Sequence, residues 1–248
     1  MSCEIDIKVN NREVKLLLNK VARQADSAVW YQDGNTILLA TLTYNPEEIV
    51  DEDFVPLSVQ YVERAYAVGK IPAGFVKREQ KPGDFETLTA RIVDRSLRPL
   101  FPKEYGYDTI ITIMALSADE ESDLQVAATN AGAAALYLSS LPFRKMVYGV
   151  RITKVNREIV INPTLSQLKK GDFNLLVTGT TDELLMIEFA AQGQEKVERI
   201  KVEDVYIDGV PLEQEVKKYF TNEISEDELI EILERAQQAI KVGAEAFE

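Results

Sequence analysis

One short segment concentrates positive charge in an otherwise acidic protein. Residues 69–101 hold seven lysines and arginines against four acidic residues, whereas the 248-residue chain has a formal net charge of −13. A small positive surface on a negative body is typical of a site that binds phosphate groups. We call residues 69–101 the basic island. Its cations are Lys70, Lys77, Arg78, Lys81, Arg91, Arg95 and Arg98.

Three of these arginines have the spacing of one helical face. Arg91, Arg95 and Arg98 are four and three residues apart, so on an α-helix they fall within about 60° of arc. Arginine forms paired hydrogen bonds with phosphate oxygens, which favours a phosphate-contacting cleft. The alternative is a stripe that internal carboxylates such as Asp94 neutralise at a subunit interface.

The loop that precedes this helix combines an aromatic ring with two cations. Phe75 is followed by Lys77 and Arg78 and preceded by a flexible Ala-Gly pair. Such a loop can stack a nucleic-acid base on the ring while the cations contact the backbone. The alternative is a surface loop whose phenylalanine packs into the core.

The composition excludes several classes of enzyme. The sequence has no histidine, which rules out Ser-His-Asp hydrolases, Cys-His proteases and His-ligated zinc sites within the chain. Carboxylates, lysines or a magnesium ion with oxygen ligands remain. Glycine motifs of the Rossmann and P-loop types are absent from the sequence. The lone Cys3, and the lack of a signal peptide or a long apolar run, predict a cytoplasmic protein with no membrane partner.

The elements that must position the basic island follow from hydrophobic periodicity and from turn residues. A helix is predicted over residues 84–98, with Asp84 as its cap and with Phe85, Leu88 and Ile92 packing inward. Pro99 ends it.

The remaining pattern alternates strands and helices irregularly. An Ala-rich helix is predicted at 123–139, capped by Ser117 or Ser122, and a closing helix at 225–247. Residues 193–222 are interpreted as an insertion or a peripheral hairpin. This order predicts an α+β layer architecture in one domain over residues 1–248. Strands are expected at 4–9, 14–18, 28–31, 36–43, 56–63, 108–115, 151–155, 158–161, 173–178 and 184–189.

Two long motifs in this chain resemble a known family. IPAGFVKRE at 71–79 and ETLTARIVDRSLRPLFP at 86–102 are similar to the first ribonuclease PH-like domain of bacterial polynucleotide phosphorylases. The resemblance covers most of residues 1–192, and residues 193–222 match poorly. It implies a ribonuclease PH-like fold, a mixed sheet with packed helices, present here in a single copy of a unit that occurs twice in the family's longer chains.

The resemblance also implies a function. The family's three-chain rings degrade single-stranded RNA from its 3′ end with inorganic phosphate as co-substrate, and the complete enzyme requires Mg²⁺. Phe75, Lys77 and Arg78 match an RNA-binding loop at the channel aperture. Arg91, Arg95 and Arg98 match positions that line the cleft between domains. The implied partners are single-stranded RNA, two further copies in a homotrimer and the second ribonuclease PH-like domain, with no DNA.

The sequence departs from the family at the residues that carry catalysis. Alignment on the turn at 177–180 puts Leu168, Asn174 and Leu176 where the catalytic copy of the fold has two aspartates and a lysine. Leucine cannot bind magnesium, and asparagine is a weak neutral ligand. We therefore expect the non-catalytic half of a longer chain, with no catalytic or metal-binding residues. The alternatives are a self-contained ribonuclease PH-type enzyme and a purely structural assembly module.

Overall fold

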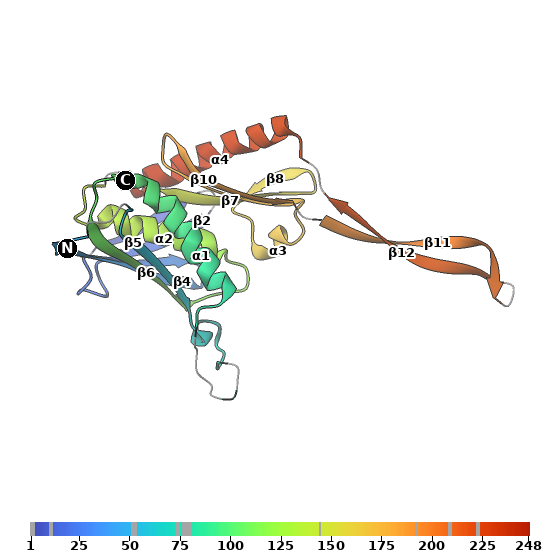
Figure 1. Cartoon of the computed structure of the whole chain (residues 1–248), viewed down its shortest axis with the longest axis horizontal. Coiled ribbons are helices and arrows are strands. Elements are labelled where there is room, and N and C mark those ends of the chain that lie inside the picture. The colour runs from blue at the N-terminus through green and yellow to red at the C-terminus, as the bar shows by residue number, and fades with distance from the viewer. Residues whose placement is uncertain are drawn as a thin grey trace.

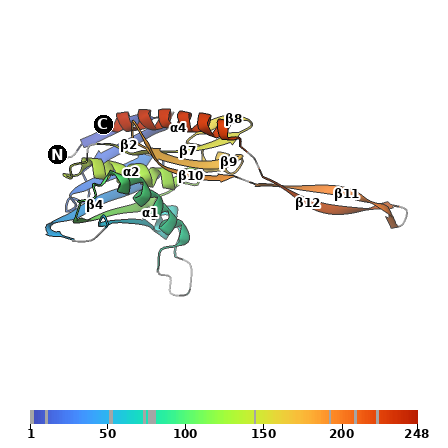
Figure 2. The same cartoon turned by 45° about the horizontal axis from the view of Figure 1, so that its top comes forward.

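Two β-sheets and three long helices form the body of the protein, from which a hairpin projects (Figure 1). The computed structural model describes residues 3–9, 12–50, 54–72, 75, 81–143, 145–191, 193–207, 210–221 and 224–248. The layers are clearest when the body is turned as in Figure 2.

The larger sheet has six strands in the order β1-β2-β3-β4-β6-β5. All neighbours are antiparallel except β5 and β6, which run parallel. The sheet is therefore mixed, and β5 is an edge strand. The strands are β1 (Cys3–Val9), β2 (Arg12–Leu18), β3 (Ser27–Asp33), β4 (Thr36–Ile49), β5 (Leu57–Glu63) and β6 (Tyr107–Ser117).

Two helices pack on one face of this sheet. They are α1 (Asp84–Leu97) and α2 (Leu124–Leu138), and α2 also contacts the second sheet. Gly132 permits the close approach: a Cβ atom there would lie 3.0 Å from Ile113 Cδ1 and 3.2 Å from Val93 Cγ1. The Ala-rich helix is thereby the central element of the core.

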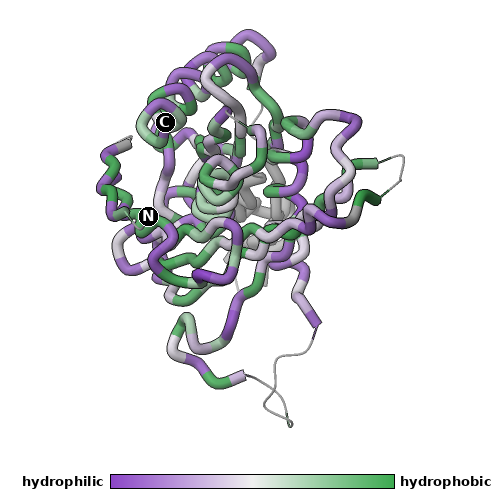
Figure 3. The backbone as a smooth tube through the Cα atoms, turned by 90° about the vertical axis from the view of Figure 1, so that its left-hand side faces the viewer, coloured by the Kyte–Doolittle hydropathy of each residue, from purple (hydrophilic) through white to green (hydrophobic). Residues whose placement is uncertain are grey.

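The second sheet has four antiparallel strands in the order β10-β9-β7-β8. The amphipathic helix α4 packs on it, and its tube at the top of Figure 3 alternates between hydrophilic and hydrophobic colours. Three short helical segments complete the body. The elements are β7 (Tyr148–Val155), β8 (Glu158–Ile161), β9 (Phe173–Gly179), β10 (Leu184–Ala191), α3 (Leu165–Leu168), α4 (Glu226–Phe247), η1 (Ala65–Val68) and η2 (Arg98–Leu100).

A long hairpin extends away from the body. Its strands β11 (Gly193–Ile207) and β12 (Val210–Thr221) pair with each other as a separate two-stranded sheet. In Figures 1 and 2 it lies at the end of the molecule opposite the C-terminal end of α4. In the described part of the chain, no helix is long and apolar enough to cross a membrane.

The predicted α+β class is confirmed, but the two expected helix caps are wrong. Gly83 is the N-cap of α1, and the Glu86 carboxylate accepts the Gly83 N–H at 2.6 Å. Asp123 caps α2 by accepting from the N–H groups of Gln125 at 3.0 Å and Val126 at 3.3 Å. The Asp123 carboxylate reaches free N–H groups of α2, whereas Gly83 has no side chain and the Glu86 carboxylate makes the hydrogen bond at the start of α1. The sequence leaves these choices open among adjacent residues.

The inward face of α1 also differs from the prediction. Ile92 is buried, whereas Phe85 and Leu88 are 45% and 52% exposed. The buried face is centred instead on Val93 and Leu97, because both the sheet and α2 lie on that side.

We predict that Gly243→Ala destabilises the protein by about 1–3 kcal/mol through overpacking. A Cβ atom at Gly243 would lie 2.3 Å from Cδ1 of the buried Tyr148 ring. At an exposed helical position, glycine to alanine increases protein stability by about 1 kcal/mol. A decrease in stability at Gly243 therefore identifies the close packing of α4 on β7. Urea unfolding measures it, with the exposed Gln238→Ala as the control. Increased stability of Gly243→Ala would contradict this packing.

Candidate functional site

The loop between η1 and α1 presents an aromatic ring to solvent. Phe75 is fully exposed, so its ring does not pack into the core. Ile71 is also largely exposed, at 75%. Lys77 and Arg78, the cations predicted to act with Phe75, lie outside the described residues. The described part of the loop therefore offers an accessible stacking surface.

A groove of about 450 Å³ separates edge strand β5 from α1. Side chains close both of its ends. At one end the Glu86 carboxylate accepts the Glu63 N–H at 2.8 Å. At the other, Arg98 donates to the carbonyl oxygens of Val55 at 2.8 Å and Leu57 at 2.9 Å. Helix α1 is therefore fixed to the edge of the sheet at its first and last turns.

The three helix arginines do not form one equivalent set. Arg98 donates to both Asp94 carboxylate oxygens, at 2.6 and 2.9 Å, in addition to the two carbonyls. The hydrogen bond that Arg98 donates to Asp94 raises the pKa of Arg98, and the negative charge of Asp94 acts in the same direction. Arg98 therefore holds α1 against β5. For this one arginine, the alternative that a carboxylate such as Asp94 neutralises its charge applies.

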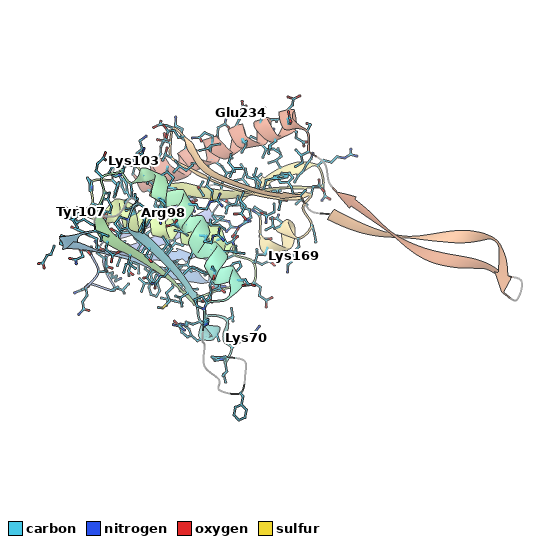
Figure 4. The ribbon with its side chains drawn as sticks, viewed as in Figure 1. Lys70, Arg98, Lys103, Tyr107, Lys169 and Glu234 are labelled. Carbon is cyan, nitrogen blue, oxygen red and sulfur yellow. The ribbon has the colours of Figure 1, made fainter. Side chains whose placement is uncertain are left out.

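Arg91 and Arg95 are exposed, and Arg91 lines the groove. Within the described part of the chain neither has an ion-pair partner. Figure 4 shows Arg98 at α1 and Lys70 beyond the opposite end of the helix, after η1. Since a helix rises 1.5 Å per residue, the two ends of α1 are roughly 20 Å apart. The basic island is therefore extended, with Arg91 and Arg95 as the free cations of its helical part.

A half-buried acid lies beside the groove. The Tyr61 hydroxyl donates to Glu63 Oε1 at 2.7 Å. Burial raises the pKa of Glu63; the Tyr61 hydrogen bond lowers it, and the nearby Glu86 raises it further. Glu63 is therefore a carboxyl group whose charged form is disfavoured in the folded protein.

The sequence predicts that Leu168, Asn174 and Leu176 replace the family's catalytic residues, and the structure shows what surrounds each of them. Leu176 is 1% exposed and packs with Ile92, Val126 and Met186. The Asn174 side-chain oxygen accepts from Arg151 Nη1. Leu168 is the last residue of the short helix α3.

Arg151 was not singled out from the sequence, yet its guanidinium is at the centre of this region. It is 5% exposed and contacts Asp123 through Nε, Asn174 through Nη1, and Gln125 through Nη2 at 2.6 Å. The available signal was an arginine placed between two β-branched apolar residues, Val150 and Ile152, at the start of a predicted strand. A buried charge of this kind requires a partner, and Asp123 supplies it.

The aligned residues do not fit a divalent cation. Leu168 and Leu176 offer no side-chain oxygen, and the Asn174 oxygen is already bound to a fixed cation. A metal ion beside Arg151 would be repelled by its charge. Among the described residues, no group of three or more acidic, histidine or cysteine side chains could hold a metal.

We predict that Arg151→Met costs about 3–5 kcal/mol, because it leaves the Asp123 carboxylate buried without its partner. The matched control is Lys154→Met in the same strand, whose partner Glu228 and own side chain are partly exposed. That change is expected to cost about 1 kcal/mol or less. Urea unfolding of both variants provides the measurement. Equal losses would show that the buried pair has no special role.

We predict that Glu63→Gln stabilises the protein at neutral pH. Because the folded-state pKa of Glu63 lies above its ordinary value of 4.5, protonation favours the folded state at low pH. This contribution is lost as the pH rises through the folded-state pKa. The difference in melting temperature between variant and wild type is therefore expected to be largest at pH 7 and to shrink on acidification. A difference independent of pH would contradict the argument.

Comparisons with known proteins agree with this fold. Residues 10–142 match the first domain of the 3′ exoribonuclease family, and residues 145–200 match its second domain. The polyribonucleotide nucleotidyltransferase of a Nitratiruptor species is 49% identical over 249 residues. That alignment covers 100% of this chain and 34% of the relative. The enzyme of the same name from Sulfurimonas denitrificans is 48% identical, and 33% of it is covered.

The chain thus spans about a third of the length of the curated relatives it matches. Solved structures share the fold at low identity. Rice Rrp46 superposes with a TM-score of 0.66 at 13% identity, covering 94% of this chain and 92% of that one. An Archaeoglobus fulgidus exosome with RNA bound to the active site gives 0.65 at 16% identity, with 96% and 89% covered. The chain therefore belongs to the 3′ exoribonuclease family.

Proposed function

We propose that this chain is the RNA-contacting, non-catalytic half of a phosphate-dependent 3′-to-5′ exoribonuclease, a polyribonucleotide nucleotidyltransferase. In that reaction an oxygen of inorganic phosphate attacks the 3′-terminal phosphodiester of single-stranded RNA. The bond to the preceding 3′ oxygen breaks, and a nucleoside diphosphate leaves. The relatives named for this activity are about 49% identical to the chain.

The observation that carries the proposal is the pair of exposed arginines on α1. Arg91 and Arg95 keep their charge available in a chain of net charge −13. Two exposed guanidinium groups one helical turn apart can contact successive phosphates of an extended strand. The accessible ring of Phe75 provides a stacking surface, and Lys77 and Arg78 are proposed to act with it.

The proposed lack of a reacting centre rests on the residues around Arg151. An internal cation contacts Asn174 and an apolar cluster surrounds Leu176, and we propose that these two positions match acidic residues of the catalytic copy of the fold. The second ribonuclease PH-like domain of the longer chain is therefore the proposed place of phosphate attack and of the Mg²⁺ requirement. We further propose that three such chains form the working ring.

We predict that the double variant Arg91→Ala/Arg95→Ala weakens binding of a labelled single-stranded oligoadenylate. Each phosphate contact to a single strand adds about 0.7 to the slope of log affinity against log salt. Loss of both contacts should therefore flatten the slope by roughly 1.4. Fluorescence anisotropy at several salt concentrations measures both quantities.

The control variant removes two positive charges from α4 instead of α1. Arg235 and Lys241 are exposed and lie in pairs with Glu231 and Glu245. Arg235→Ala/Lys241→Ala should leave the slope unchanged. Equal effects of the two double variants would contradict a specific site on α1. Release of nucleoside diphosphates from polyadenylate and phosphate by the chain alone would contradict the proposed lack of a reacting centre.

A further inference from the structure

The projecting hairpin carries all of its lysines and arginines in the half that adjoins the body (Figure 1). We call β11 and β12 together the arm. Strand β10, which contacts α1, continues into β11 after a single residue. The positive half of the arm is therefore joined to the sheet edge that contacts the helix of Arg91 and Arg95. The cations of the arm are Lys196, Arg199, Lys201, Lys217 and Lys218.

The strand register neutralises two of these cations within the arm. Arg199 is directly opposite Glu215, and Lys201 is directly opposite Glu213. Opposite charges at directly paired positions of an antiparallel ladder stabilise it. These two positions are therefore balanced by the arm itself.

A third pair in the same register joins two like charges. Lys196 is directly opposite Lys218. Like charges at paired positions destabilise a ladder, and in the described part of the chain β11 and β12 pair only with each other. Glu198 is the next residue of β11 on the same face, but one carboxylate balances only one of two ammonium groups. An anion bound at this pair would replace the repulsion with attraction.

An aromatic residue shares the face of the lysine pair. Phe220 is two residues beyond Lys218 along β12, and every second residue of a strand lies on the same face. Its opposite residue, Gln194, is uncharged. Cations beside an aromatic ring are the combination that binds single-stranded nucleic acid, with phosphates at the cations and a base on the ring. This face of the arm therefore suits a phosphate chain that also carries bases.

We propose that Lys196, Lys218 and Phe220 form a second contact for single-stranded RNA, separate from the one on α1. Residues 202–212, toward the tip, hold three acidic residues and no cation, so they repel phosphates and confine the contact to the half of the arm beside the body. The inference goes beyond the proposed function, which places RNA on α1 and the loop before it, and it rests on RNA being the ligand of this chain.

Lys196→Gln/Lys218→Gln tests the lysine pair in the 248-residue chain. Each phosphate contact to a single strand contributes about 0.7 to the slope of log affinity against log salt, so the slope should flatten by roughly 1.4. Fluorescence anisotropy with a labelled single-stranded oligoadenylate measures it. The substitutions also remove a like-charge repulsion, so the urea midpoint of the variant should be equal to or above that of the wild type.

The matched control removes the same charge from the same arm. Arg199→Gln/Lys201→Gln acts at positions that already face acidic residues, so it should leave the slope unchanged. Phe220→Leu removes a stacking ring and no charge. It is expected to weaken oligoadenylate binding about tenfold at an unchanged slope.

Arg91→Ala/Arg95→Ala in the same assay separates this inference from the proposed function. Adding it to the lysine variant should flatten the slope by roughly 2.8 in total, because the two sites bind different phosphates. A flattened slope for the arginine variant beside an unchanged slope for the lysine variant would overturn the arm site alone. Unchanged slopes in both would overturn the arm site together with the proposed function.

Two further results would also contradict the arm site. Equal flattening by Lys196→Gln/Lys218→Gln and Arg199→Gln/Lys201→Gln would reveal a general charge effect in place of a site. Wild-type affinity of Phe220→Leu, with complete displacement of oligoadenylate by inorganic polyphosphate, would identify a polyanion site that does not recognise RNA.

Discussion

The buried contact between Arg151 and Asp123 joins the two halves of the protein. Arg151 comes from β7 of the four-stranded sheet, and Asp123 caps the helix that packs on the six-stranded sheet. One carboxylate therefore both starts the central helix and neutralises the central buried cation. Such a pair favours one arrangement of β7 and α2, because any other arrangement would leave a buried charge without an opposite charge beside it. The packing of both sheets on α2 depends on this local charge balance.

The same principle separates the arginines of this fold by role. Arg151 and Arg98 direct their charge inward, to carboxylates, two side-chain amides and backbone carbonyls. Arg91 and Arg95 direct theirs to solvent. An internally satisfied guanidinium fixes elements in place, whereas an unpaired one attracts anions over a longer range. Arg98 anchors α1 to β5, and that anchoring determines where Arg91 and Arg95 are presented.

Charge is also distributed unequally over the surface as a whole. The acidic body, the exposed cations of α1 and the uncharged strand positions Trp30 and Leu39 are three distinct environments on the surface of this chain. These environments suit different contacts, since phosphate groups are attracted by the cations and repelled by the acidic body. The mixed sheet keeps these environments apart, because its two faces point in opposite directions.

The sequence by itself determined the α+β class, most strands and helices and the extent of the basic island, because these follow from local periodicity and turn chemistry. It also determined that Leu168 and Leu176 cannot bind a metal. Only the tertiary structure decided which polar group caps each helix, that Phe85 and Leu88 stay exposed, and that Arg98 binds inward. It alone brought Arg151 to Asn174 and aligned Trp30 with Leu39. These depend on contacts between residues far apart in the chain, and such contacts are fixed by packing and strand register, which no local pattern encodes.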